Sequence, residues 1–572
     1  MTGNRNVHSG QIVVAEIVAV ALVVAALSRV PLGWLLGVPV AAALAVLAFG
    51  RWRRRWVYQW VGIALRYGSR PRAIPPGADL LALVGPGAEA SSVELGGRGY
   101  GVIADEFGVT AVLEVGDPTG LLSDAPLALP SPVPLLPPTA PDTPGVQLQL
   151  LVSGCPARAA GIPGTSYRQL TEGRVAAYQR VLLAVRVLRD DSGWSDDDLH
   201  RALASTLRRL RRRLGVPHRP LGYDALLAAL AELAHHDPGS PVRESWPGLY
   251  AGGLRQASLR VRRFAGLRPE LAGQLIPRLL ALPATATTVS LAASQAGADL
   301  VVRVAAPSAT GLGTAVQALR RLVGSAGLEV TRLDGEQLAG LAATLPLGLV
   351  GEPAPPGALA QCRTELPGPG VMLGRNRRGV PVTARLIRRE PTRVLVVGGV
   401  RAAEMLTLRA LALGVHVLVQ TGRPDAWEPF LRAVSLPSDA IGLVPPGRPL
   451  ALPAGTPLAP QLVVVDVGPL VGDPPVGEAA WRTTVVLRDD LAAADLDTLA
   501  RADLVVLQPL RPDEAALAGP TLGLLGEGQE WLTRIRADMI GLVNRRTVRF
   551  ALLSATPLEQ QLIGAPERLA VP

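Results

Sequence analysis

Two apolar runs dominate the start of the chain. Ile12–Leu27 is interrupted only by Glu16, and Pro31–Phe49 contains no charged residue. At about 1.5 Å per helical residue, the two runs approach the roughly 30 Å thickness of a bilayer core. Because the connector Ser28–Pro31 is so short, we expect a transmembrane helical hairpin over residues 1–50.

Small residues recur every four positions in the second run, at Gly33, Gly37, Ala41 and Ala45. This spacing would let another helix approach closely in lipid, although simple apolar filling explains it equally well. Glu16 is expected at the membrane interface or paired with a partner helix, because an isolated carboxylate in lipid is costly.

A basic, tryptophan-rich segment follows over residues 51–78. It begins with Arg51, Trp52, Arg53, Arg54, Arg55, Trp56 and Trp60. The tryptophans recur every four residues, so we expect them to share one helical face at the headgroup level of anionic lipids. By the positive-inside rule, the chain is predicted to be a two-pass inner-membrane protein with its N-terminus and C-terminal domains in the cytoplasm. A cleaved signal peptide ending near Ser28 is the alternative, disfavoured by the second run and the arginines.

Short strands alternate with helices over residues 79–350, which predicts a cytoplasmic α+β portion. The expected strands are Tyr100–Asp105, Val109–Val115, Val146–Val152, Val181–Leu188, Arg255–Arg263, Thr287–Ala293 and Leu300–Val304. Helices are expected from Ser195 to Arg213, over Tyr223–His235 and over Thr310–Val323. The last two strands and the last helix complete a βαβ-like unit. Nine prolines between Pro118 and Pro144 predict an extended loop.

A proline- and glycine-rich linker over residues 351–369 separates this portion from a Rossmann-like α/β portion over residues 370–572. Its apolar runs predict a doubly wound, mostly parallel sheet. The expected strands are Val394–Val397, Val415–Val419, Leu462–Val465, Thr483–Leu487, Leu504–Leu507 and Val548–Leu553, with helices Ala402–Leu413 and Pro424–Val434.

The amino-acid composition excludes several kinds of catalytic site. The 572 residues are 48% hydrophobic and 18% charged, and all 57 cationic side chains are arginine. The lack of lysine excludes a P-loop lysine and a pyridoxal-phosphate anchor. Much of the formal charge of +10 lies in the seven arginines of residues 51–72, so a membrane surface is a better expected partner than nucleic acid.

The nucleotide-site candidates are weak. Gly398, Gly399 and Val400 follow a strand and open a helix, but the glycine spacing of a dinucleotide fingerprint is absent. Leu462–Asp466 looks like a Walker B strand, yet no Walker A partner exists without lysine. Asp466 is better explained as a strand-end residue that bonds its following turn.

Metal and nucleophile candidates are also better explained structurally. An acidic set comprises Asp190, Asp191, Asp196, Asp197 and Asp198, the last three of which suit a helix N-terminus. His235 and His236 close a helix and point to different faces. Cys155 and Cys362 have no recognisable catalytic partner. We therefore predict no catalytic, cofactor-binding or metal-binding residue, and no cofactor.

Several sequence features, in their order along the chain, resemble the EccE component of actinobacterial type VII secretion systems. The resemblance rests on the hairpin, the basic segment Arg51–Tyr67, the strands of Gly99–Val115, the helix end Arg409–Gly414 and the motif Gln420–Pro424 with Trp427. It implies a non-catalytic inner-membrane subunit that assembles with EccB, EccC and EccD near the mycosin protease. The alternative is a membrane-anchored nucleotide or nucleotide-sugar enzyme that uses Gly398 and Asp466.

Overall fold

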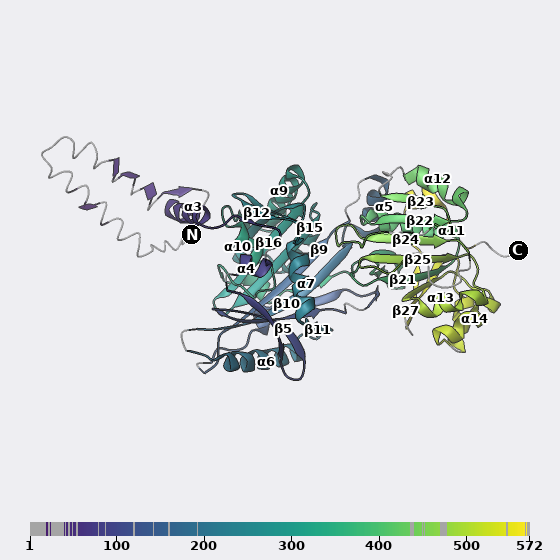
Figure 1. Cartoon of the computed structure of the whole chain (residues 1–572), viewed down its shortest axis with the longest axis horizontal. Helices are drawn as coiled ribbons and strands as arrows, with labels where there is room; N and C mark the ends of the chain where they lie inside the picture. Colours follow the sequence, from purple (N-terminus) through teal and green to yellow (C-terminus); the bar gives the residue numbers. More distant parts are fainter. Residues whose placement is uncertain are drawn as a thin grey trace.

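Figure 1 shows the chain as a computed structural model with two globular bodies side by side. Residues 50–568 are described, except 53–54, 78, 86, 118–119, 141, 158–160, 191–192, 435–439, 449, 451, 469–476, 525, 545–546 and 567. Before residue 50, only positions 16, 19–20, 23, 39–40, 42–43 and 46–47 are described.

The predicted transmembrane hairpin over residues 1–50 is contradicted. Crossing a bilayer takes about 20 consecutive apolar residues in one helix, and no helix in the described part of the chain is long and apolar enough. The prediction of a two-pass inner-membrane location depended on that hairpin and is therefore also wrong. Most positions of the two apolar runs lie outside the described residues, including Gly33, Gly37, Ala41 and Ala45.

The segment after the apolar runs is not one continuous helix. Arg51–Trp52 (β1) pairs antiparallel with Arg55–Trp56 (β2), and the helix α3 spans Val57–Ser69. The prediction that the three tryptophans share one helical face is therefore wrong, because two of them precede the helix.

The N-terminal domain is built on a large antiparallel sheet. Its strands are β3 (Ala73–Ile74), β4 (Glu89–Glu94), β5 (Gly99–Asp105), β6 (Gly108–Val115), β9 (Val146–Cys155), β10 (Tyr178–Leu188), β11 (His218–Pro220), β12 (Val242–Ser245), β13 (Gly248–Ala251), β14 (Leu254–Arg262), β15 (Ala286–Ser294), β16 (Gly297–Ala306) and β17 (Glu329–Arg332). Its helices are α4 (Leu80–Val84), α6 (Asp196–Arg213), α7 (Tyr223–Ala234), α8 (Pro269–Leu280), α9 (Ala309–Ser325) and α10 (Gln337–Ala342). The expected βαβ-like unit is wrong, because β15 and β16 form an antiparallel hairpin.

The sheet has an internal two-fold pattern. From its centre outward, one half runs β9, β10, β6, β5, β4, and the other runs β15, β16, β14, β13, β12. In each half the second strand leads to a long helix and a short strand: α6 and β11 in one, α9 and β17 in the other. Because β11 pairs with β6 and β17 with β14, these strands also occupy matching places.

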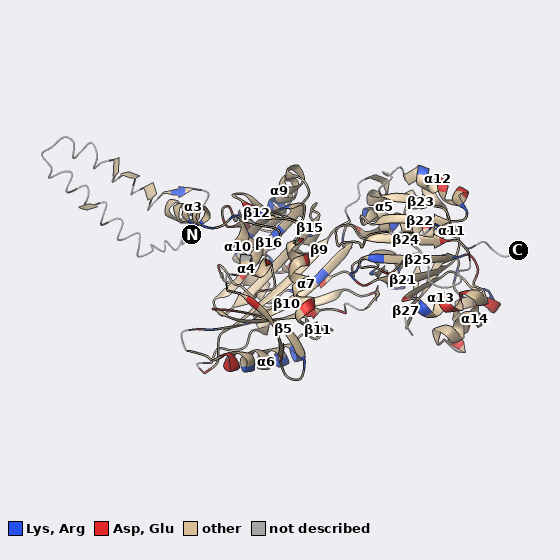
Figure 2. Ribbon diagram, in the orientation of Figure 1, with Lys and Arg blue, Asp and Glu red and all other residues tan. Residues whose placement is uncertain are grey.

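Helix α6 illustrates why the elements form where they do. The Ser195 side chain accepts a hydrogen bond from the backbone N–H of Asp198, whose carboxylate reaches back to the Ser195 backbone. Acidic residues fill the first turn and arginines the last, as the helix dipole favours (Figure 2). Leu199, Leu203 and Leu207 repeat at helical spacing and pack into the core beneath the sheet.

The C-terminal domain holds the predicted parallel sheet. Its strands are β19 (Val371–Arg375), β20 (Pro381–Ala384), β21 (Thr392–Val397), β22 (His416–Thr421), β23 (Ile441–Val444), β24 (Gln461–Asp466), β25 (Arg482–Arg488), β26 (Leu504–Leu507), β27 (Met539–Asn544) and β28 (Thr547–Leu552). Its helices are α11 (Val400–Ala412), α12 (Pro424–Val434), α13 (Leu496–Arg501), α14 (Pro512–Leu522), α15 (Glu527–Thr533) and α16 (Pro557–Ile563). The order β23-β22-β24-β25-β21-β26 is parallel, and β27 and β28 continue it antiparallel.

The two domains exchange segments. Helix α5 (Gly161–Thr171) lies between β9 and β10 in sequence but packs on α11 of the C-terminal domain (Figure 1). The Tyr167 hydroxyl donates to the Gly370 carbonyl at 2.8 Å and accepts from the Met372 N–H at 3.0 Å. Short strands repeat this exchange: β7 (Leu122–Ser123) pairs with β20, and β8 (Leu127–Pro130) with β18 (Arg363–Leu366).

Candidate functional site

The carboxyl ends of the parallel strands are where an open α/β sheet binds ligands, and the sequence candidates meet there. Gly398 follows β21, and Gly399 is the N-cap of α11. The Gly399 N–H donates to the Gln508 side-chain oxygen at 2.9 Å, and Gln508 also donates to the Pro566 carbonyl. Since a Cβ on Gly398 would collide with Gln508, this side chain already fills the position that a phosphate would take at the helix N-terminus.

Asp466 ends β24 at the same edge and is only 5% exposed. It accepts hydrogen bonds from the Thr421 hydroxyl at 3.0 Å, the Trp427 indole at 2.9 Å and the Arg423 guanidinium at 2.8 Å. Arg423 also pairs with Asp489, and these hydrogen bonds to carboxylates raise its pKa. Asp466 therefore fastens the turn after the neighbouring strand β22, rather than its own following turn, and its carboxylate is fully engaged.

Residues near the C-terminus cover the rest of this edge. Arg568 donates to Glu514 at 2.8 Å, to Asp490 at 3.0 Å and to the Asp489 carbonyl at 2.7 Å. Although burial acts to raise it, the pKa of the Glu514 carboxyl is lowered, because Arg568 and two backbone N–H groups stabilise the anion. Among the described residues of this edge, Gln508 covers the start of α11, and ion pairs within the chain cover Asp466 and Glu514.

A partly open cavity of about 150 Å³ is lined by residues of both domains. On its N-terminal side, Arg180 bridges Glu114 and Glu232, each at 2.9 Å. Arg219 adds a second contact to Glu114 at 2.7 Å, and the Tyr178 hydroxyl donates to Glu232. Both carboxylates therefore have cationic partners within the chain.

Several side chains that line the cavity have shifted pKa values. Burial, reinforced by the charge of Glu232, raises the pKa of Tyr178. Burial also raises the pKa of Glu232 despite the nearby Arg180. On the C-terminal side, burial lowers the pKa of Arg385, which donates to the Asp117 carbonyl at 2.7 Å. These strong internal pairs suit a fixed contact between domains better than a reacting group.

The metal and nucleophile candidates occupy structural positions. Asp196 pairs with Arg189, Asp198 pairs with Arg201, and Asp191 lies outside the described residues. In the described part of the chain, no group of three or more histidine, cysteine, aspartate or glutamate side chains could hold a metal ion. His235 is the left-handed C-cap of α7.

The cysteines and the other acidic and histidine candidates do not converge on one site. Cys155 is buried at the end of β9. Cys362 is half-buried, and its pKa is raised by burial. Asp197 lies in the first turn of α6, and His236 follows α7.

The basic, tryptophan-rich segment is attached to the N-terminal domain. The Trp60 ring lies 5.4 Å from Trp52 and 6.1 Å from Trp246, and its indole donates to the Trp52 carbonyl at 2.9 Å. The Arg55 guanidinium is buried and binds Glu336 at 2.8 Å. Arg51 lies over the Trp56 ring at 3.9 Å, whereas Arg53 and Arg54 lie outside the described residues.

Comparisons with known proteins identify neither a family nor a function for this chain. No family model and no curated protein matches the chain. Among solved structures, the chain is similar to the DNA-packaging ATPase B204 of Sulfolobus Turreted Icosahedral Virus, at 10% identity and a TM-score of 0.22, covering 28% of this chain and 96% of that one. The genome packaging NTPase B204 of Sulfolobus turreted icosahedral virus 2, in complex with ATP-gammaS, gives a TM-score of 0.21 at 10% identity, with coverages of 28% and 96%. TM-scores this low support no statement about function.

Sequence reasoning missed the partners that close these sites. Gln508 and Arg568 lie far from Gly398 and Glu514 in sequence, and no local pattern marks them. For Arg423, the available signal was its place four residues after the predicted strand Val415–Val419, at the same sheet edge as Asp466.

Proposed function

We propose that this chain is a non-catalytic assembly subunit of a type VII protein secretion complex and binds the EccB, EccC and EccD subunits through surfaces of its two α/β domains. The identity of the complex is supported by the resemblance to EccE of the sequence features other than the hairpin, namely Arg51–Tyr67, Gly99–Val115, Arg409–Gly414 and Gln420–Pro424 with Trp427. Mycosin and anionic lipid headgroups are further proposed partners, and nucleic acid is not one.

The proposal that the chain is non-catalytic rests on the closed carboxyl edge of the parallel sheet. Gln508 fills the helix N-terminus beside Gly399, and Arg423 engages Asp466. A nucleotide would have to displace these contacts, and removing the guanidinium would leave the buried Asp466 carboxylate without its cationic partner, which is unfavourable. A domain whose ligand edge is sealed in this way is well suited to presenting fixed surfaces to other proteins.

Affinity purification of the tagged full chain tests the assembly role. In a host that encodes a type VII system, we expect EccB, EccC and EccD to co-purify, and we expect deletion of the gene to abolish export of the system's substrates. Restoring the wild-type chain should restore export. Recovery of the chain without any of these subunits would overturn the proposal.

Nucleotide titration tests the non-catalytic part separately. Thermal unfolding of the purified chain should be unchanged by ATP, GTP or a uridine-diphosphate sugar with Mg²⁺. A ligand at about 100 times its Kd would add roughly 2.7 kcal/mol of stability. A rise of that size, abolished by Gly398→Val, would favour the nucleotide or nucleotide-sugar enzyme instead.

A further inference from the structure

An arginine-rimmed groove lies on the C-terminal domain, away from the closed strand edge. Its volume is about 1150 Å³. One wall is the β19–β20 hairpin turn, the other is the end of α15 with the loop after it, and β28 runs along the floor.

The floor of the groove is apolar. Val548, Phe550 and Leu552 alternate along β28, so they point to the same face of the sheet. Trp531 packs beside Phe550, with ring centroids 6.4 Å apart, yet remains 55% exposed. Leu552 is 42% exposed. Large apolar side chains gathered in this way at a surface mark a binding site more often than scattered ones do.

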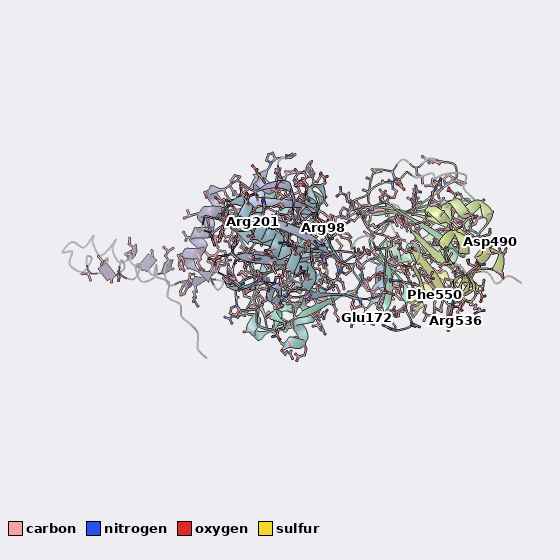
Figure 3. The ribbon with its side chains drawn as sticks, turned by 90° about the horizontal axis from the view of Figure 1, so that it is seen from below. Arg98, Glu172, Arg201, Asp490, Arg536 and Phe550 are labelled. Carbon is pink, nitrogen blue, oxygen red and sulfur yellow. The ribbon has the colours of Figure 1, made fainter. Side chains whose placement is uncertain are left out.

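The rim of the groove is strongly cationic. It carries Arg375, Arg377, Arg378, Arg534, Arg536 and Arg549, against the single lining carboxylate of Asp124. Figure 3 shows Arg536 and Phe550 close together on this domain. Arg549 pairs with Asp124 at 2.6 Å, Arg536 with Asp538 at 2.6 Å, and Arg534 with Glu530 at 3.0 Å. Arg377 and Arg378 are exposed and make no ion pair with any described residue.

Strand β28 is also incompletely paired. It matches β27 from Thr547 to Leu552, but it meets β19 only through Leu552 and Arg375. Most of one edge of β28 therefore has no neighbouring strand among the described residues. An exposed strand edge readily accepts an extended segment of another protein.

We propose that this groove binds an acidic, extended segment of a partner protein, whose carboxylates meet the arginine rim and whose apolar side chains cover Trp531 and Leu552. Charge complementarity selects the acidic partner. A protein segment fits better than nucleic acid, because the floor is mainly aliphatic and offers one exposed aromatic ring rather than a series of stacking platforms. The groove proposal goes beyond the assembly role and does not depend on which complex the chain joins.

A labelled peptide tests the proposal directly. Fluorescence anisotropy of the full chain would be measured with a short fluorescein-labelled peptide that alternates glutamate with leucine and phenylalanine. A matched peptide carries glutamine in place of glutamate. We expect only the acidic peptide to bind, and its affinity to fall as salt rises, because exposed ion pairs are screened.

Variants locate the binding site. Arg377→Glu with Arg378→Glu should weaken binding at least about tenfold, since two ion pairs with the peptide are lost and the reversed charges repel it. Trp531→Ala should weaken it about tenfold through lost apolar contact. The matched control is Arg208→Glu with Arg212→Glu, which makes the same charge change on the exposed face of α6. This control should leave the affinity unchanged.

Several outcomes would overturn the groove proposal. They are equal binding of the two peptides, an equal loss of affinity in the α6 control, and unchanged affinity in both groove variants. Single-stranded oligonucleotide that displaces the peptide and binds more tightly would assign the groove to nucleic acid. A concentration-dependent dimer that Arg377→Glu with Arg378→Glu abolishes would assign it to a second copy of the chain. None of these measurements depends on co-purification of secretion subunits, so the two proposals fail separately.

Discussion

The Arg409–Glu559 pair offers a sharp test of how the C-terminal domain is held together. The two side chains are 2% and 1% exposed and meet through two hydrogen bonds of 2.8 and 2.9 Å. Arg409 also donates to the carbonyls of Met372, Leu373 and Ser554. One guanidinium thus joins α11 to β19, to the segment after β28 and to α16.

Removing one charge should cost at least as much stability as removing both. Glu559→Leu leaves Arg409 buried without its carboxylate, which costs about 3–5 kcal/mol. In the double variant with Arg409→Met no buried charge is stranded, and the main cost is three carbonyls without donors, at roughly 1 kcal/mol each. We therefore expect the double variant to be less destabilised than the sum of the two single variants by at least about 3 kcal/mol.

Native-state hydrogen exchange is the suitable assay, because it reports local opening free energies without assuming that both domains unfold together. Peptides from α11, α16 and β19 should exchange more than 100-fold faster in Glu559→Leu, since each 1.4 kcal/mol is tenfold. The control is Glu428→Leu, which breaks an exposed pair with Arg432 of the same 2.8 Å length and should cost under about 0.5 kcal/mol. Single-variant effects that add to within about 0.5 kcal/mol would refute the reasoning.

Three further variants test other contacts. Burial raises the pKa of Glu404 to about 7, above the pKa of this side chain in the unfolded chain. Protonated Glu404 therefore stabilises the folded state fully below about pH 4.5, and this stabilisation is lost as the pH rises through 7. Glu404→Gln should flatten that slope in urea-unfolding midpoints measured against pH. Tyr167→Phe leaves the Gly370 carbonyl and the Met372 N–H unpaired and should speed exchange in α5 by about tenfold or more. Asp466→Asn weakens its charged hydrogen bonds and should lower stability by about 2 kcal/mol, whereas an unchanged unfolding midpoint would show that the closed edge contributes little.

The C-terminal domain was largely predictable because its signals are local. Continuous apolar runs such as Val394–Val397 and Leu462–Val465 lie inside the observed β21 and β24, since parallel strands are buried on both faces. Helix α11 begins directly after the glycine pair, two residues before the predicted start. What the sequence could not reveal is the filling of the strand edge, because Gln508 and Arg568 come from elements distant in the chain.

The N-terminal domain was predicted less well because strand pairing was misread. Only Gln295 and Ala296 separate β15 from β16, and two residues can join antiparallel strands but not parallel ones, which need a crossover of a dozen or more. The short gap followed by Gly297 was the available signal. The exchange of α5 into the other domain had no such signal, because that helix resembles any other short helix in sequence.

The two-fold pattern of the N-terminal sheet explains why two arginines are buried in it. Arg186 on β10 and Arg303 on β16 occupy matching places, each within a Val-Arg-Val triplet. Arg186 donates to the Leu347 carbonyl after α10 of the other half, and Arg303 donates to the Leu233 carbonyl near the end of α7, again of the other half. Among the described residues Arg303 contacts no carboxylate, and burial lowers its pKa to about 9, so burying this side chain costs desolvation free energy. Each half therefore supplies a carbonyl acceptor to a buried arginine of the other half, although the charge of Arg186 is paired with Asp105 of its own half. Separating the halves would break both of these hydrogen bonds.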